Sequence, residues 1–266
     1  MLKLENVFTH PLMLKKSSTL LKIRIGFYIV SWVHLFSVAT ILLRIDFTVE
    51  EDPVLQTYHT TKWRLITAWF NLLSMAYMPV SAYCDWRELR GEANKPHVKF
   101  LNTFRYAVFS SILLPTTIFA DVLFWQLWRK DREFIAPASV DRLIPFWTQH
   151  CMHTVSLMVV ILDLILVPRK RPTNLWPGIV LMLAFILAYT YVLIQSVMQG
   201  QYIYPVLKNF SKWKYIVLMI YTLSSHMFYY SLQWFVNDFI WNTNSKVATN
   251  LSMSVTCVLK KLGARD

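Results

Sequence analysis

The chain has 266 residues, of which 55% are hydrophobic and only 16% are charged, and its mean hydropathy is +0.38. Soluble proteins carry about 25% charged residues, so the composition excludes an ordinary soluble domain and favours an integral membrane protein. The net charge is +12, but the Lys and Arg residues lie between apolar runs and form no basic face with interleaved aromatic residues, which argues against a nucleic-acid partner.

In chain order, the sequence offers six mostly apolar runs with the length of about 20 residues that a helix needs to cross a bilayer. They are residues 21–43, 64–83, 104–127, 146–168, 176–198 and 214–235. The pattern predicts an all-α protein, a polytopic six-helix transmembrane bundle that forms one domain over residues 1–266. The first run is longer than the apolar core of a signal peptide, about 7 to 15 residues, so we expect it to be retained.

The charges between the runs predict the orientation of this bundle. An even number of spans places both termini on one side, and that side carries 17 Lys and Arg residues against 10 on the other. Because cytoplasmic loops are enriched in Lys and Arg, we expect both termini to be cytosolic. A multi-pass protein of the endoplasmic reticulum or the plasma membrane fits this pattern.

The fourth run begins with two histidines, His150 and His153, three residues apart. On an α-helix this spacing puts both rings on one face. Ionisable side chains in an apolar span are costly, so an intramembrane histidine indicates a functional site. The pair also resembles half of a metal site, but His34 and His226 lie alone in other runs, so we expect no metal. No other cofactor is predicted.

The predicted topology places a hydroxyl near the second of these imidazoles. At 1.5 Å per residue, Thr67 lies roughly 6 Å and His153 roughly 10 Å below the exoplasmic ends of their helices. An imidazole within hydrogen-bond reach can take the proton of an attacking hydroxyl. Asn71, one turn below Thr67, is a candidate to orient this pair or to donate to an oxyanion. Asp121 is a candidate partner for His153. His150 is expected to contact the catalytic residues and hold them in place rather than to react itself.

Other readings of the same residues stay open. A threonine in a membrane helix usually bonds to a carbonyl one turn earlier, and a buried histidine can serve as an interhelical hydrogen-bond donor. Asp121 can pair with a cation or an amide. A transporter would show helices broken by Gly or Pro at matched positions, whereas Pro79 and Pro115 are unmatched. A scaffold or receptor would need neither Thr67 nor His153.

Several short motifs resemble those of a known family in order and spacing. Gln56-Thr57-Tyr58, followed by Trp63-Arg64-Leu65-Ile66-Thr67, resembles the QTY and WK-x-L-T signature of the androgen-induced and androgen-dependent TFPI-regulating protein family. Further matches are Phe124-Trp125, Asp131-Arg132-Glu133, Ile144-Pro145 with Trp147, His150-x-Met152-His153-Thr154, Tyr204-Pro205 and Ile240-Trp241. The chain departs from the pattern by one extra residue between Tyr58 and Trp63 and by His59-Thr60 in place of a glycine pair.

The resemblance implies both an activity and the residues that carry it. Proteins of that family are six-span membrane hydrolases that cleave fatty acid esters of hydroxy fatty acids with a threonine nucleophile and a histidine. The matching positions are Thr67 and His153. The implied function is an intramembrane threonine hydrolase whose lipid ester substrate enters laterally from the bilayer, without a cofactor. The sequence points to membrane lipids as neighbours and to no particular protein partner.

Overall fold

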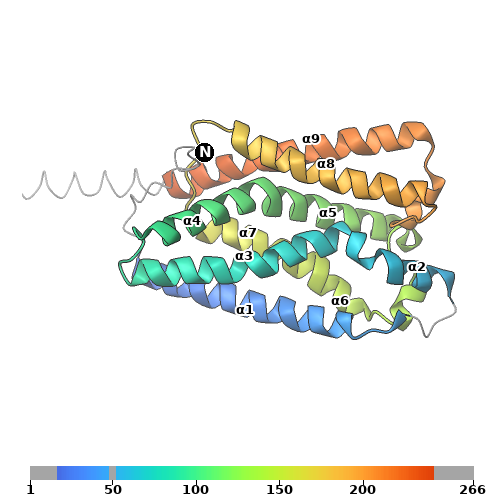
Figure 1. The fold of residues 1–266 in the computed structure, drawn as a ribbon, viewed down its shortest axis with the longest axis horizontal. Coiled ribbons are helices and arrows are strands. Elements are labelled where there is room, and N and C mark those ends of the chain that lie inside the picture. Colours follow the sequence, from blue (N-terminus) through green and yellow to red (C-terminus); the bar gives the residue numbers. More distant parts are fainter. Residues whose placement is uncertain (1–16, 48–51, 243–266) are drawn as a thin grey trace, which may run out of the picture.

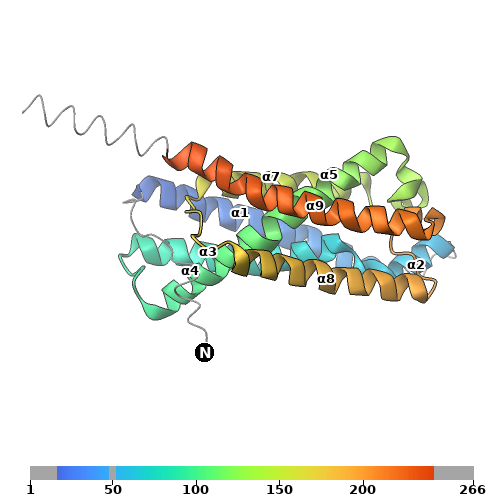
Figure 2. The ribbon, with the colours of Figure 1, turned by 90° about the horizontal axis from the view of Figure 1, so that it is seen from above.

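The computed structural model describes residues 17–47 and 52–242, and all regular secondary structure within these ranges is helical. The long helices lie side by side along the longest axis of the molecule (Figure 1), and the perpendicular view in Figure 2 shows the same elongated bundle. The predicted all-α class is therefore confirmed.

Each of the six predicted runs coincides with a helical segment. The α-helices are α1 (Ser18–Leu43), α2 (Pro53–Thr61), α3 (Ile66–Leu89), α4 (Pro96–Val108), α5 (Leu114–Lys130), α6 (Phe146–His150), α7 (Ser156–Leu166), α8 (Trp176–Met198) and α9 (Lys212–Asn237). The π-helical turns are η4 (Phe109–Leu113), η7 (Cys151–Val155) and η9 (Asp238–Asn242). The 3₁₀ turns are η3 (Lys62–Arg64), η5 (Arg132–Phe134), η6 (Ala138–Arg142) and η8 (Pro205–Asn209). The turn η4 joins α4 to α5, and η7 joins α6 to α7, so each trio forms one long helix.

Not all of these helices are apolar enough to count as membrane spans. Among the described residues, four segments qualify by length and composition: Ser18–Leu43, Pro96–Lys130, Phe146–Leu166 and Trp176–Met198. A fifth is added if Leu55–Arg64 and Ile66–Leu89, bent by 46°, are one span. The 26-residue α9 is long enough but also carries Lys, Ser, Gln and His residues. The six-span count and the cytosolic termini stay predictions, and residues 1–16 and 243–266 lie outside the described part of the chain.

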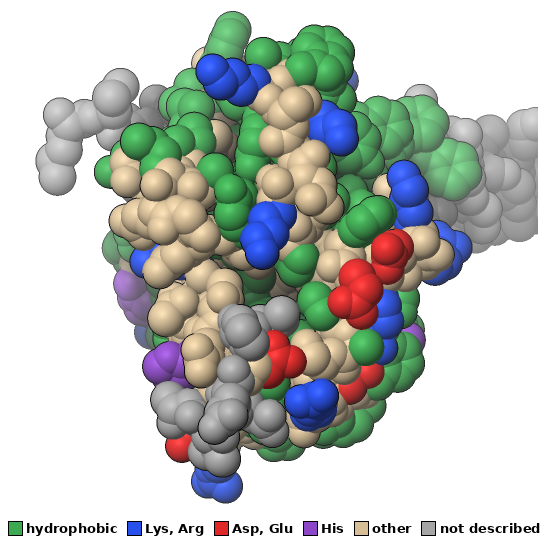
Figure 3. Space-filling model, turned by 90° about the vertical axis from the view of Figure 1, so that its right-hand side faces the viewer, with side chains coloured by type: hydrophobic (Ala, Val, Ile, Leu, Met, Phe, Trp, Pro, Cys, Tyr) green, Lys and Arg blue, Asp and Glu red, His purple; other side chains and the backbone are tan. Residues whose placement is uncertain are grey.

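The long helix Pro96–Lys130 forms the centre of the bundle. Its most apolar stretch is 78% buried, against 17% to 28% for the other three candidate spans. Large apolar side chains are exposed on the outer helices, for example Val30, Leu187 and Phe235. Such a surface suits lipid rather than water. In contrast, Lys, Arg, Asp and Glu side chains are spread over the end of the bundle near α2 (Figure 3).

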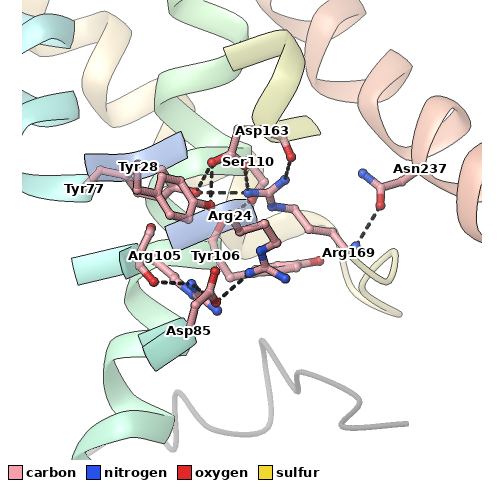
Figure 4. A network of polar contacts seen from close by, with 11 residues as sticks. Arg24, Tyr28, Tyr77, Asp85, Arg105, Tyr106, Ser110, Asp163, Arg169 and Asn237 are labelled. Atoms are coloured by element: carbon pink, nitrogen blue, oxygen red, sulfur yellow. Dashed lines mark hydrogen bonds and ion pairs between the residues drawn. The ribbon is translucent and has the colours of Figure 1, made fainter. Parts of the chain in front are cut away.

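Two groups of buried charges lie among α1, α3, α4 and α7, and together we call them the charge cluster (Figure 4). In the first, Asp85 Oδ1 accepts hydrogen bonds from Arg24 Nη2 at 2.6 Å and Arg105 Nη1 at 2.9 Å. Arg24 and Asp85 are fully buried. Because a buried charge is costly without a partner, this pairing fixes α1 and α4 against the end of α3.

The second group is centred on Asp163 of α7. Asp163 Oδ2 accepts hydrogen bonds from Tyr28 at 2.8 Å and Tyr77 at 2.9 Å, while its Oδ1 pairs with Arg169 Nη2. The guanidinium of Arg169 also lies 3.7 Å from the ring centroid of Phe109. Asp163 therefore ties α7 to α1 and α3.

Pro115 follows the π-helical turn η4 and removes a backbone donor from the middle of the central helix. Proline has no N–H to give to the carbonyls of the preceding turn. The side chain of Gln233 on α9 compensates, because its Nε2 donates to the Ser110 carbonyl at 2.8 Å. This bond helps to hold α9 against the central helix.

Candidate functional site

An apolar cavity of about 480 Å³ lies between the start of α3, the central helix α5, and helices α8 and α9. Its volume falls within the range of about 300 to 1,000 Å³ that is typical of ligand pockets. The walls are mostly Leu, Ile, Val, Met and Phe. Polar side chains are few, and they include Thr67 and His153, which come from different helices. The structure thus brings the two predicted residues to one cavity.

A break in the helix positions Thr67. The chain leaves α2 through the turn η3, and Leu65 is extended with φ −67° and ψ 137°, so that α3 starts at Ile66 and Thr67 lies in its first turn. Arg64 holds this break against the end of α8, because its Nη1 donates to Ser196 Oγ at 3.1 Å and Gln201 Oε1 at 2.7 Å.

The hydroxyl of Thr67 has no hydrogen-bond partner among residues 17–47 and 52–242, although the residue is only 9% exposed. The hydroxyls of Thr116 and Thr117 in α5 are likewise buried without a partner in the described chain, whereas several other threonines bond back to the helix. The Oγ1 atoms of Thr40, Thr61 and Thr103 donate to the carbonyl four residues earlier, at 2.8, 2.8 and 3.0 Å. Back-bonding, the usual state of a threonine in a membrane helix, therefore does not occupy Thr67.

Two contacts hold the ring of His153, which lies in the π-helical turn η7. Its Nδ1 lies 2.9 Å from Asp121 Oδ1, and its ring stacks on Phe124 with centroids 3.6 Å apart. The second oxygen of Asp121 accepts a hydrogen bond from Ser156 Oγ at 2.6 Å. Because a carboxylate only accepts, Nδ1 carries the ring proton in this pair and Nε2 is left as the basic nitrogen. The predicted contact between Asp121 and His153 is therefore present.

Asn71 lies away from this cavity. It lines a separate pocket of about 20 Å³, roughly the space of one water molecule, together with Ser31, His34, Ser74 and Thr117. One helical turn separates Asn71 from Thr67, but the two side chains do not line the same space. Its role at the site stays a prediction, and the geometry does not support it.

His150 also lies outside the lining of the cavity. Its ring packs 4.8 Å from Trp125 and 4.9 Å from Phe146, and its Nδ1 lies 3.1 Å from Thr154 Oγ1. A π-helical turn has more residues per turn than an α-helix, so the three-residue spacing does not keep the two imidazoles on one face. Within the described residues, the contacts of His150 are with Trp125, Phe146 and Thr154, and none of them supports the predicted role at the site.

Three tyrosines without a predicted role line the same cavity, and two of them contact each other. Tyr189 comes from α8 and Tyr204 from the loop before η8, and their hydroxyl oxygens are 2.8 Å apart. The backbone N–H of Ile66 donates to the Tyr204 hydroxyl at 3.1 Å. The only sequence signal for them was the Tyr204-Pro205 motif, which does not indicate a partner on another helix.

No three His, Cys, Asp or Glu side chains gather in the described part of the chain in a way that could hold a metal ion. The polar side chains that line the cavity are three threonines, three tyrosines and two histidines: Thr67, Thr190, Thr222, Tyr189, Tyr204, Tyr215, His153 and His226. Of the two imidazoles, His153 is backed by the carboxylate of Asp121. This set can perform nucleophilic and acid–base chemistry. The expected absence of a metal or cofactor stays a prediction.

Comparisons with known proteins agree on one family. The family profile described as FAR-17a/AIG1-like protein matches residues 27–238. The chain is 30% identical over 183 residues to the androgen-dependent TFPI-regulating protein of Mesocricetus auratus, covering 67% of this chain and 78% of that protein. It is 28% identical over 151 residues to the Homo sapiens protein of the same name, covering 56% and 64%. It is 25% identical over 203 residues to the androgen-induced gene 1 protein of Homo sapiens, covering 74% and 84%. No solved structure matches significantly.

Proposed function

The chain belongs to the FAR-17a/AIG1-like family, and from this premise we propose that it is an intramembrane hydrolase of lipid esters, with Thr67 as the nucleophile and His153 as the general base. One observation carries the proposal. Thr67 and His153 come from helices far apart in the sequence, yet both side chains line one apolar cavity, and the Thr67 hydroxyl has no hydrogen-bond partner in the described chain. The substrate class that the motifs imply is a fatty acid ester of a hydroxy fatty acid.

The polar groups suit a two-step acyl transfer. Thr67 Oγ1 attacks the ester carbonyl carbon while His153 Nε2 takes the hydroxyl proton. The bond to the leaving alcohol then breaks, and His153 returns the proton to that oxygen, which leaves the acyl group on Thr67. Water attacks the carbonyl carbon of the acyl-threonine ester while the same histidine takes its proton. The bond from that carbon to Thr67 Oγ1 then breaks, His153 returns the proton to Oγ1, and the fatty acid is released. Asp121 holds the ring so that Nε2 is the nitrogen that exchanges protons.

The walls of the cavity support a lipid substrate. Its lining is predominantly aliphatic and aromatic, which suits a long acyl chain. The helices around it expose apolar side chains such as Leu187 and Met219. Entry of the ester from the bilayer therefore needs no crossing of a polar barrier.

The test measures labelling by a fluorophosphonate probe and hydrolysis of a lipid ester by the purified full-length chain. We expect Thr67→Ala and His153→Ala to lose at least about 10²-fold in kcat, the lower end of general acid–base contributions. Thr67→Ser keeps the hydroxyl and is expected to keep measurable labelling. Thr40→Ala removes a hydroxyl already bonded to a carbonyl, and His150→Ala removes an imidazole outside the cavity, so both serve as matched controls.

The result decides between enzyme and nonenzymatic protein. Loss of labelling in both Thr67→Ala and His153→Ala, at equal amounts of folded protein, supports the hydrolase. Unchanged labelling in either variant would contradict the assignment of that residue. Absence of labelling and hydrolysis in the unmodified chain as well would favour a transporter or a scaffold.

A further inference from the structure

The pair of phenols at the cavity stands next to the proposed nucleophile. Tyr189 and Tyr204 line the same cavity as Thr67 and His153. The Tyr204 hydroxyl is held by the backbone N–H of Ile66, the residue directly before Thr67. The pair is therefore fixed to the first turn of α3, the same turn that carries the attacking hydroxyl.

Counting donors shows that this pair has one hydrogen to spare. A phenol has one O–H hydrogen, so the pair has two. One of them makes the 2.8 Å bond between Tyr189 and Tyr204, in either direction. Ile66 is a donor to Tyr204 and takes up no phenol hydrogen. Within residues 17–47 and 52–242 the second hydrogen has no acceptor, although Tyr189 is only 9% exposed.

An unused donor beside an apolar cavity needs an acceptor that arrives with the ligand. A buried polar hydrogen without a partner costs free energy, and an ester carbonyl oxygen can accept it. The need is greatest when that oxygen becomes negatively charged. Preorganised donors of this kind supply a large part of the rate enhancement of acyl-transfer enzymes.

We infer that the Tyr189–Tyr204 pair donates the hydrogen bond that stabilises the oxyanion formed when Thr67 attacks the ester, an assignment that rests on the proposed function. As the bond from Thr67 Oγ1 to the carbonyl carbon forms, the π electron pair moves to the carbonyl oxygen and the threonine proton moves to His153. The phenol hydrogen bonds to this oxyanion. When the tetrahedral intermediate collapses, the C=O bond re-forms, the bond to the leaving alcohol breaks, and His153 protonates the alcohol.

The surroundings of Tyr204 keep the pair in the donor state. Burial raises the pKa of the Tyr204 phenol above its ordinary value, so the group stays protonated at neutral pH. The Ile66 N–H polarises the Tyr204 hydroxyl, because linked hydrogen bonds strengthen one another. Asn71, the candidate oxyanion donor predicted from its position one turn from Thr67, lines a different pocket.

The test uses Tyr189→Phe, Tyr204→Phe and the double variant in the full-length protein. Loss of the donor is expected to lower kcat by about 10² to 10³, the effect of removing one oxyanion donor, with little change in KM. A lipid trifluoromethyl ketone, which forms a tetrahedral oxyanion adduct with the nucleophile, should bind more weakly by a similar factor. An ether analogue of the ester, which has no carbonyl, should bind unchanged. Tyr191→Phe is the control, because Tyr191 lies on the same helix and is 64% exposed.

Each outcome supports or overturns the inference. Equal losses of ether and ketone affinity would mean that the tyrosines only maintain the cavity, and this would overturn it. Full kcat and full ketone affinity in the double variant would overturn it too, provided that Thr67→Ala is inactive, and the proposed function would then stand. If Thr67→Ala stays active, the proposed function itself is wrong. The ratio of the two affinities, measured on one sample, is independent of the folded fraction.

Discussion

Replacing Asp121 by Asn tests how the site fixes the protonation of His153. The substitution keeps the size of the side chain but removes its charge and adds a donor. Asp121 is fully buried, and its Oδ1 lies 2.9 Å from His153 Nδ1. An amide nitrogen turned toward Nδ1 would donate to it, which stabilises the tautomer with the proton on Nε2. That tautomer cannot accept the Thr67 proton.

The lost charge gives the size of the effect. Two unit charges 2.9 Å apart interact by about 6 kcal/mol at an effective dielectric constant of about 20. This interaction stabilises the imidazolium that forms as Thr67 attacks. Since about 1.4 kcal/mol corresponds to a factor of ten in rate, its loss is equivalent to about 10⁴ in kcat. A drop of about 10⁴ is also what the same substitution causes in a Ser-His-Asp triad. We therefore expect Asp121→Asn to lower kcat by 10³- to 10⁴-fold, by order of magnitude.

The assay is hydrolysis of a lipid ester at neutral pH by purified protein in detergent micelles, with thermal unfolding measured on the same samples. Ser156→Ala is the matched control, because it removes the other hydrogen bond to Asp121 and keeps the carboxylate. We expect it to retain most of kcat. If Asp121→Asn keeps the kcat of the wild type while the separate Thr67→Ala variant is inactive, the role of the carboxylate is refuted.

Two further substitutions test the packing of the bundle. Gly178→Ala should lower the free energy of unfolding by about 1 to 3 kcal/mol, the usual cost of overpacking, because its new Cβ would lie 2.2 Å from the Tyr230 hydroxyl oxygen. The added change Tyr230→Phe should recover part of the loss in melting temperature, and failure to do so would contradict the contact. Asp85→Asn leaves two buried guanidiniums without their carboxylate and should cost about 3 to 5 kcal/mol of stability. Glu92→Gln, at partly exposed ion pairs with Lys95 and Arg87, is its control, and an equal fall in melting temperature in both variants would show that burial is not the cause.

The helices around the central helix could be predicted because membrane-spanning helices are recognised by their local composition. The apolar run 176–198 coincides with α8, and the run 21–43 lies within α1. The predicted run 214–235 lies within α9, but α9 is less apolar than the helices that qualify as candidate spans.

The candidate site was predictable only in part, because side-chain direction depends on backbone details that apolar runs do not encode. The depths of Thr67 and His153 along their helices were enough to predict that the two residues lie near each other, and both line one cavity. The same spacing arguments fail for His150, since the π-helical turn η7 changes the direction in which the following residues point. The pairing of Tyr189 with Tyr204 depends on how a loop folds back onto α8, and no local pattern indicates it.

The charge cluster and the cavity lie toward opposite ends of α3, since Thr67 and Asp85 are separated by about 27 Å at 1.5 Å per residue. Damage at the two places should therefore be visible in different measurements. A substitution at Asp85 lowers the steady-state amount of protein in cells, because quality control removes unstable chains. We expect Thr67→Ala to leave that amount unchanged and to remove turnover. A library of random variants can be scored for abundance and turnover in parallel. Within α3, variants near Asp85 should lose abundance, and variants near Thr67 should lose turnover.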